Sequence, residues 1–110
     1  MNHVLIICAG GMSSSLMAKK TTEFLRDKGY DMEVDATSTE EGRKRIEKAS
    51  YDLYLVSPQT KMYYDGLKKA GDRVGKPVEN IPPQAYVPIP MGVEKLGNVI
   101  LESLPNGEVK

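Results

Sequence analysis

The alternation of short apolar segments with longer amphipathic stretches constrains the fold of this 110-residue chain more than any other feature. Residues 3–8 (HVLIIC) form a continuous apolar run, which is typical of a strand buried on both faces of a sheet. Apolar and polar residues alternate over 31–37 (DMEVDAT), as they do in a half-exposed strand. Residues 52–56 (DLYLV) are again mostly apolar, whereas 77–81 (PVENI) are short with a polar centre. We therefore predict four strands, two of them central and two at the edges.

The stretches after these four segments show the spacing of amphipathic helices. We predict that Gly29 ends the first helix and that Thr39 caps the second, with Glu40 and Glu41 in its first turn. Gly66 and Gly71 weaken the third helix because glycine has a low helix propensity. The positions that define the buried faces of the four helices are Met17, Thr21, Phe24 and Leu25, then Ile46 and Ala49, then Tyr63, Leu67, Ala70 and Val74, and finally Val93, Leu96, Ile100 and Leu104.

Strands that alternate with helices predict an α/β fold with a parallel sheet, helices on both faces and right-handed crossovers. Placing the two continuous apolar strands in the centre gives the strand order 2-1-3-4 in a single domain of residues 1–110. This arrangement is flavodoxin-like and similar to the topology of low-molecular-weight phosphatases. In such sheets a ligand binds at the carboxyl ends of the strands, next to the first strand.

Composition excludes several classes of function. Fifteen Lys and Arg balance fifteen Asp and Glu, so net charge does not indicate a nucleic-acid partner. The longest apolar run, over residues 4–9, is far shorter than the roughly 20 residues that cross a membrane, so we expect no direct membrane insertion. One Cys and one His are too few for an ordinary zinc site or an internal disulfide. We expect a cytoplasmic protein without a metal or cofactor, monomeric when isolated.

The segment after the first strand carries the candidate chemistry. Its two glycines permit a tight turn, and its serines lead into a helix whose first N–H groups have no partner within the helix. Such N–H groups bind anions, phosphate in particular, and they favour a thiolate by lowering the cysteine pKa below about 8.5. The alternative is that the cysteine is only a buried strand-end residue. The segment consists of Cys8, Ala9, Gly10, Gly11, Met12, Ser13, Ser14 and Ser15.

Motifs that the sequence lacks argue against several classes of phosphate-binding protein. Neither GxxxxGK[ST] nor GxGxxG occurs, which argues against a nucleoside triphosphatase or a dinucleotide site. A cysteine-dependent phosphatase loop needs an arginine six positions after its cysteine, but Ser14 stands there and the next cation is Lys19. The site therefore suits holding a thiophosphate better than hydrolysing it. The alternatives are a cysteine-dependent phosphatase of similar fold and a non-catalytic nucleotide- or flavin-binding module.

Residues 4–16 (VLIICAGGMSSSL) resemble the IIB component of the lactose/cellobiose class of the bacterial phosphoenolpyruvate-dependent sugar phosphotransferase system. That family has an aliphatic strand ending in Cys, a turn of small residues, and then Gly-Met-Ser and a helix. Residues 56–59 (VSPQ) are similar to the Gly-Pro-Gln that the family commonly has after its third strand. Two positions depart from the pattern: Ser14, where Thr is common, and Ser57, where Gly is common.

The resemblance implies a phosphoryl carrier with phosphotransferase activity. Cys8 would accept a phosphoryl group from a phosphohistidine on a IIA partner and form a phosphocysteine. It would then donate the group to a sugar, such as the β-linked disaccharides cellobiose or lactose, bound by a IIC membrane permease. Residues 9–15 would form the phosphate-binding loop, with Pro58 and Gln59 at its rim. No metal or diffusible cofactor is implied.

Overall fold

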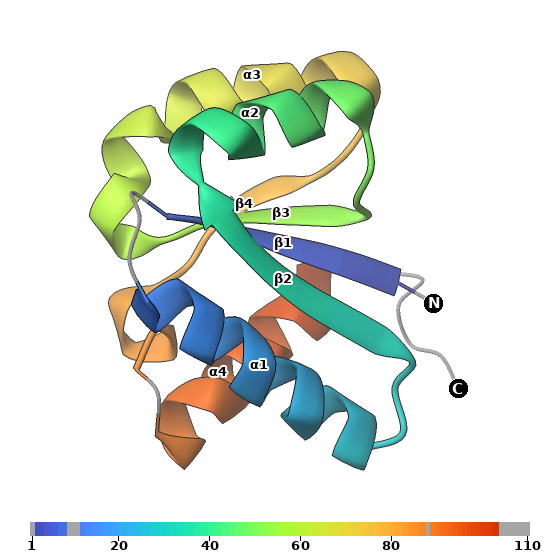
Figure 1. Ribbon diagram of the computed structural model, residues 1–110, viewed down its shortest axis with the longest axis vertical. Coiled ribbons are helices and arrows are strands. Elements are labelled where there is room, and N and C mark those ends of the chain that lie inside the picture. Colours follow the sequence, from blue (N-terminus) through green and yellow to red (C-terminus); the bar gives the residue numbers. More distant parts are fainter. Residues whose placement is uncertain (1, 9–11, 88, 104–110) are drawn as a thin grey trace.

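Four parallel strands form the centre of the molecule, of which the computed structural model describes residues 2–8, 12–87 and 89–103. The strands lie in the order β2-β1-β3-β4, and each neighbouring pair is parallel. This confirms the predicted order, with the most apolar segments in the centre of the sheet (Figure 1). The strands are β1 (Asn2–Cys8), β2 (Met32–Ser38), β3 (Leu53–Val56) and β4 (Val78–Asn80).

Helices cover both faces of this sheet, as the alternating pattern predicts. Figure 1 shows α1 and α4 together on one face and α2 and α3 on the other. Two short 3-10 helices that the pattern does not predict, η1 and η2, precede α3 and α4. The prediction that Tyr63 belongs to the apolar face of the third helix is wrong, because Tyr63 ends η1 as the N-cap of α3 and its side chain is exposed. The helices are α1 (Met12–Asp27), α2 (Thr39–Lys48), α3 (Tyr64–Val74), α4 (Pro90–Ser103), η1 (Pro58–Tyr63) and η2 (Pro83–Ala85).

The continuous apolar run of β1 serves two separate cores. Val4 and Ile6 point into the cluster beneath α1 and α4, whereas Leu5 and Ile7 point into the cluster beneath α2 and α3. All four side chains are fully buried because strand residues alternate between faces and both faces are covered. The end of β1 is thus held in place by packing on both faces of the sheet.

The predicted cap of the second helix is one residue too late. Strand β2 continues through Ser38, which is paired with Cys8, so the chain stays extended for one residue longer than the alternating pattern suggests. Ser38 is the N-cap of α2, and its hydroxyl accepts a hydrogen bond from the backbone N–H of Glu41 at 3.3 Å. Thr39 is the first helical residue, and Glu40 and Glu41 occupy the first turn as expected.

The remaining helix ends agree with prediction in part. Gly29 follows α1 with a φ of 94°, which confirms its role as a stop signal. Ala49 does not join the core as predicted: it ends α2 in a left-handed conformation with a φ of 53°, and its N–H bonds the Ile46 carbonyl at 2.9 Å. The fourth helix begins at Pro90, earlier than its apolar spacing indicates, and Leu104 lies outside the described residues.

Candidate functional site at the carboxyl end of the sheet

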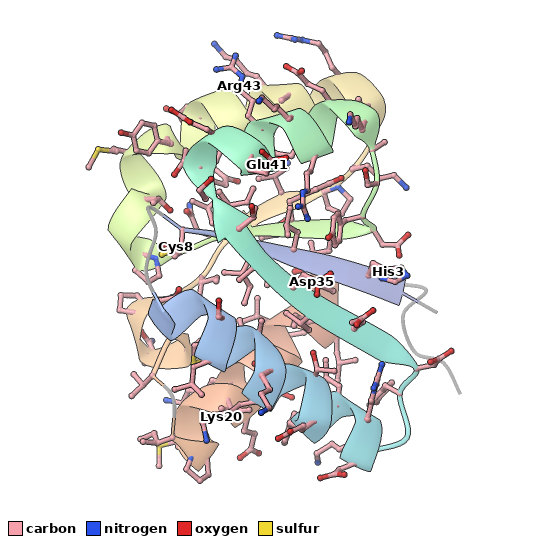
Figure 2. All side chains as sticks on the ribbon, in the orientation of Figure 1. His3, Cys8, Lys20, Asp35, Glu41 and Arg43 are labelled. Atoms are coloured by element: carbon pink, nitrogen blue, oxygen red, sulfur yellow. The ribbon has the colours of Figure 1, made fainter. Side chains whose placement is uncertain are left out.

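Cys8 is the last residue of the central strand β1, and only 1% of its surface is exposed. Its neighbour across the sheet is Ser38, the last residue of β2. Figure 2 shows Cys8 at the end of the sheet where α1 begins, with His3 at the opposite end of β1. This is the carboxyl end of the first strand, where the topology predicts a ligand site.

Helix α1 begins at Met12, four positions after Cys8 in the sequence. Its first turn contains Ser13 and Ser14 and no acidic residue. The first four N–H groups of an α-helix have no partner within the helix, and the dipole of a 16-residue helix adds partial positive charge there. The start of α1 therefore suits an anion, and the Ser15 side chain in this turn is exposed. The predicted loop residues Ala9, Gly10 and Gly11 lie outside the described residues.

A buried hydroxyl cluster lies directly behind Cys8. The Ile7 carbonyl accepts hydrogen bonds from the Ser57 backbone N–H at 3.0 Å and from the Thr60 hydroxyl at 3.2 Å. The hydroxyls of Ser57 and Thr60 are 3.0 Å apart, and both residues are fully buried. The sequence motif around residue 57 points to this loop, but no local pattern identifies Thr60, because it contacts a residue 53 positions away.

Two further loop contacts surround the end of β1. The Thr39 hydroxyl lies 3.5 Å from the Cys8 carbonyl, which is the long limit for a hydrogen bond. Pro58 begins η1 immediately after the Ser57 contact and is half-buried, and the backbone of Gln59 is in the same 3-10 helix. The predicted rim residues thus follow β3, the strand that pairs with the Cys8 strand.

Exposed apolar side chains gather on the segments that follow the carboxyl ends of the strands. One comes from the start of α1, two from η1, two from the segment that leads into α4, and one from the first turn of α4. Large apolar side chains with this much exposure indicate a surface that another protein can cover. They are Leu16, Met62, Tyr63, Val87, Ile89 and Met91.

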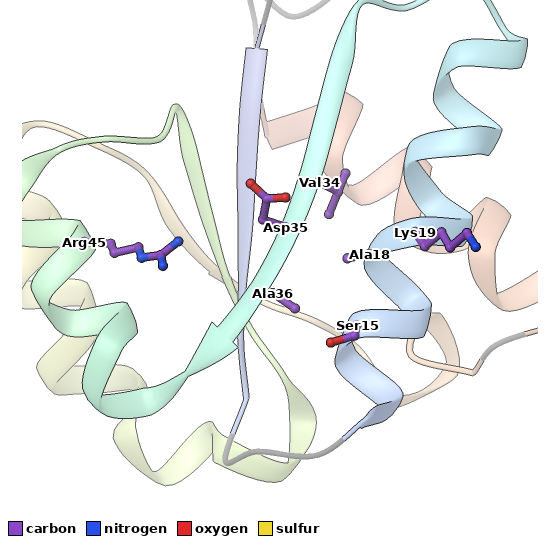
Figure 3. Close-up of a pocket in the computed structure, with 7 residues that line it drawn as sticks. All are labelled: Ser15, Ala18, Lys19, Val34, Asp35, Ala36 and Arg45. Atoms are coloured by element: carbon purple, nitrogen blue, oxygen red, sulfur yellow. The ribbon is translucent and has the colours of Figure 1, made fainter.

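A surface hollow of about 440 Å³ lies along the edge strand β2, but it does not open onto Cys8. Figure 3 shows Ser15 on one side of this hollow and Arg45 on the other. The Arg45 guanidinium donates a hydrogen bond to the Tyr51 hydroxyl at 2.9 Å, and that hydroxyl donates to Asp35 at 3.1 Å. The charge of Arg45 is therefore engaged in a polar network of the fold and does not supply the arginine that a phosphatase loop needs.

The network also explains an electrostatic feature of Tyr51. Burial is the largest cause of its raised pKa, and the nearby Asp35 carboxylate adds to the increase.

Within the described part of the chain, no three His, Cys, Asp or Glu residues are grouped so that they could hold a metal ion. Over the same residues no helix is both long and apolar enough to cross a bilayer.

Comparison with known proteins confirms the family that the sequence resembles. The family model for the lactose/cellobiose-specific IIB subunit of the phosphotransferase system matches residues 3–97. The oligo-β-mannoside-specific EIIB component of Bacillus subtilis is 31% identical over 86 residues, which cover 78% of this chain and 82% of that protein. The lactose-specific EIICB component of Lactococcus lactis is 30% identical over 73 residues, 66% of this chain but only 12% of that longer protein.

A solved structure shares this fold although its sequence is only distantly similar. The lactose-specific IIB component domain of Streptococcus pneumoniae superposes with a TM-score of 0.79 at 22% sequence identity, covering 93% of this chain and 96% of that domain. The same fold and the match over residues 3–97 agree with the motif around Cys8. The chain therefore belongs to the lactose/cellobiose-specific IIB family of sugar phosphotransfer components.

Proposed function

We propose that Cys8 is the phosphoryl-carrying residue of this IIB protein. The observation that carries the proposal is the position of the chain's one cysteine, at the end of the central strand and before the N-terminus of α1, within a family of phosphotransfer components. The Cys8 thiolate attacks the phosphorus of a phosphohistidine on a IIA partner. A sulfur–phosphorus bond forms while the nitrogen–phosphorus bond breaks, and the electron pair of the broken bond returns to the imidazole nitrogen.

The second transfer releases the phosphoryl group to the sugar. A sugar hydroxyl oxygen attacks the phosphorus, the oxygen–phosphorus bond forms, and the sulfur–phosphorus bond breaks to regenerate the Cys8 thiolate. The proton of that hydroxyl leaves to a base or to water. Backbone N–H groups of residues 9–15 are suited to binding the phosphoryl oxygens in both steps. Without an arginine six positions after Cys8, hydrolysis by water is poorly supported, which favours a carrier over a phosphatase.

The partners follow from this role. Phosphoryl transfer requires a IIA donor and a IIC permease to dock in turn at the Cys8 end of the sheet, where the exposed apolar side chains gather. A relative in which IIB and IIC form one protein supports the IIC partnership. We infer that the chain acts as one domain at the cytoplasmic side of such a permease. Its sugar would be a β-linked disaccharide such as cellobiose or lactose.

The first prediction concerns Cys8→Ser. This change replaces one atom at a strand end, so the fold should remain, with a stability cost of about 1–2 kcal/mol. Phosphoryl transfer should be abolished, because a serine hydroxyl is far less acidic than a thiol and the described structure places His3, the chain's one histidine, at the opposite end of β1. The measurements are thermal unfolding and intact mass after incubation with a phosphorylated IIA protein.

The wild-type chain is the control and should gain a single phosphoryl adduct in the same incubation. A folded Cys8→Ser variant that still gains the adduct would show that another residue is the carrier. Rapid turnover of a small phosphate ester without any partner protein would instead support the phosphatase alternative.

A further inference from the structure

The peptide unit that precedes Cys8 is held by two buried hydrogen bonds to its carbonyl oxygen. The Ile7 carbonyl belongs to this unit and accepts from both the Ser57 N–H and the Thr60 hydroxyl, at 3.0 and 3.2 Å. The Ser57 N–H continues the β1–β3 ladder beyond the Ile7–Val56 pair, so the backbone alone accounts for it. The Thr60 bond is an addition that the sheet does not require.

The direction of the hydroxyl cluster depends on where Thr60 donates its one hydroxyl proton. The acceptors within reach are the carbonyls of Ile7 and Ser57, both at 3.2 Å, and the Ser57 hydroxyl at 3.0 Å. When Thr60 donates to the Ile7 carbonyl, Ser57 is the donor in the hydroxyl pair, and a chain of hydrogen bonds runs from Ser57 through Thr60 to Ile7. Both residues are fully buried, so water does not compete for these groups.

We propose that Thr60 is a positioning residue for phosphoryl transfer: its hydroxyl fixes the Ile7–Cys8 peptide unit so that the Cys8 side chain is presented toward the start of α1. This inference rests on the proposed role of Cys8. Because a peptide unit is planar, holding the Ile7 carbonyl also holds the Cys8 nitrogen and the Cys8 Cα, the atom from which the side chain leaves the strand. The Thr39 hydroxyl, 3.5 Å from the Cys8 carbonyl, adds a weaker restraint on the following peptide unit.

The hydrogen bond from Thr60 to the Ile7 carbonyl also changes the electrostatic potential at the Cys8 sulfur. A carbonyl oxygen carries partial negative charge, and the Ile7 carbonyl is one peptide unit away from the thiolate or the phosphorylated sulfur. A hydroxyl that donates to this carbonyl reduces the negative potential near the sulfur, and it does so in a site from which water is excluded. Loss of the hydroxyl should therefore both misplace Cys8 and disfavour its ionised form.

Two substitutions separate the hydroxyl from the shape of Thr60. Thr60→Val keeps the branched shape and removes the hydroxyl, whereas Thr60→Ser keeps the hydroxyl and removes the methyl group. We expect transfer from a phosphorylated IIA protein to be about tenfold slower in Thr60→Val and within about twofold of wild type in Thr60→Ser. The midpoint of the pH profile for Cys8 alkylation by iodoacetamide should move to higher pH in Thr60→Val only.

Thr22→Val is the matched structural control. Thr22 also anchors a strand through its hydroxyl, which accepts from the Val34 N–H of β2 at 2.9 Å and donates to the Ala18 carbonyl at 2.8 Å. It lies in the second half of α1, whereas Cys8 precedes the start of that helix. Its loss should lower stability without changing the alkylation midpoint or the transfer rate. All rates are compared at a temperature at which unfolding measurements show each variant to be folded.

The outcomes decide between positioning and packing. Unchanged transfer in Thr60→Val, or equally slow transfer in Thr60→Ser, would overturn the proposal. So would faster alkylation of Thr60→Val at an unshifted midpoint, because that result indicates only a loosened structure. If wild type gains no phosphoryl group, the proposed function fails, and the alkylation midpoints still test whether Thr60 acts on Cys8.

Discussion

Tyr54 shows at the scale of one residue how this small domain accommodates a polar group in its core. Its side chain is fully buried in β3, and its hydroxyl donates to the Arg45 carbonyl and accepts from the Tyr51 N–H, each at 3.0 Å. Burial raises its pKa above the ordinary value of 10.0, an effect that the backbone hydrogen bond from Tyr51 partly opposes. The hydroxyl is thus satisfied only in its neutral form.

This environment predicts a stability difference that depends on pH. A raised pKa means that the folded protein keeps the Tyr54 proton at a pH where the unfolded chain releases it. The contribution to stability is therefore complete below about pH 10 and is lost as pH rises toward the folded pKa. Tyr54→Phe should cost about 1–3 kcal/mol at neutral pH, because two buried backbone groups lose their partner. The measurement is urea unfolding of both proteins from neutral to alkaline pH.

The difference in stability between wild type and Tyr54→Phe should shrink above pH 10. Other groups titrate equally in both proteins, so the comparison isolates Tyr54. A difference that stays constant across this range would show that the tyrosine ionises as easily in the folded protein as in the unfolded chain.

The sequence predicts the structural role of a residue where that role depends on its neighbours along the chain. The position of Cys8 at a strand end and Gly29 after a helix follow from their immediate neighbours, and both are confirmed. The cap of α2 was misplaced by one residue because pairing with Cys8, 30 positions earlier, extends β2 through Ser38. Thr60 could not be found at all, since its importance depends on a contact with a distant strand.

At the scale of elements, two glycines of α3 that look alike in sequence have opposite roles. A Cβ at Gly71 would lie 2.8 Å from the Lys76 carbonyl oxygen and would also meet the side chain of Val78. A Cβ at Gly66 would meet nothing within 4 Å, and this glycine is exposed. By helix propensity, both glycines should lower the stability of the protein. Only Gly66 does so, because the close approach of α3 to β4 requires a residue without a side chain at position 71.

Alanine substitutions should therefore change stability in opposite directions. Gly66→Ala should stabilise the protein by up to about 1 kcal/mol, the gain expected from helix propensity alone. Gly71→Ala should destabilise it by about 1–3 kcal/mol, because the clash with a backbone carbonyl exceeds that gain. Urea unfolding of the two variants beside wild type measures both effects. Equal changes in stability at the two positions would show that the α3–β4 contact does not limit the residue at 71.

The elements themselves were largely predictable because their hydrophobic period is strong. The burial of residues 4–8 in β1 and of Leu53–Val56 in β3 follows from apolar runs. Helix α2 was predictable although only Gly42 and Ile46 in it are buried, because its charged residues mark the exposed face. The 3-10 helices η1 and η2 were missed, since prolines and a few polar residues at their starts are equally typical of irregular loops. Of the two, η1 carries Thr60, which bonds the Ile7 carbonyl next to Cys8.

At the scale of the whole molecule, the site is assembled from segments that the sheet brings to one edge. The end of β1 supplies Cys8, the start of α2 supplies Thr39, and the loop after β3 supplies Ser57 and Thr60. Crossover connections place all of these at the carboxyl ends of parallel strands, although Cys8 and Thr60 are 52 positions apart in the sequence. The proposed phosphoryl site is therefore assembled only when the chain folds, which has a thermodynamic consequence.

Phosphorylation of Cys8 should stabilise the folded protein. A thiophosphate at a residue that is 99% buried would destabilise the fold if its charge had no partners, because desolvation of an ion costs several kcal/mol. If N–H groups at the start of α1 and in residues 9–15 bind it, hydrogen bonds to a charged group contribute about 1.5–3 kcal/mol each, and they exist only in the folded state. The sign of the change thus reports whether the anion site exists.

The measurement is urea unfolding at 25 °C of protein phosphorylated by a IIA donor, beside unmodified protein and protein alkylated at Cys8 with iodoacetamide. We expect the phosphorylated form to unfold at a higher urea concentration than the unmodified form. The alkylated form should unfold at a lower one, because the neutral adduct adds volume at a buried position without binding the N–H groups as an anion does. A phosphorylated form less stable than the unmodified protein would mean that the charge is not neutralised at Cys8, and the start of α1 would then not be the phosphate-binding site.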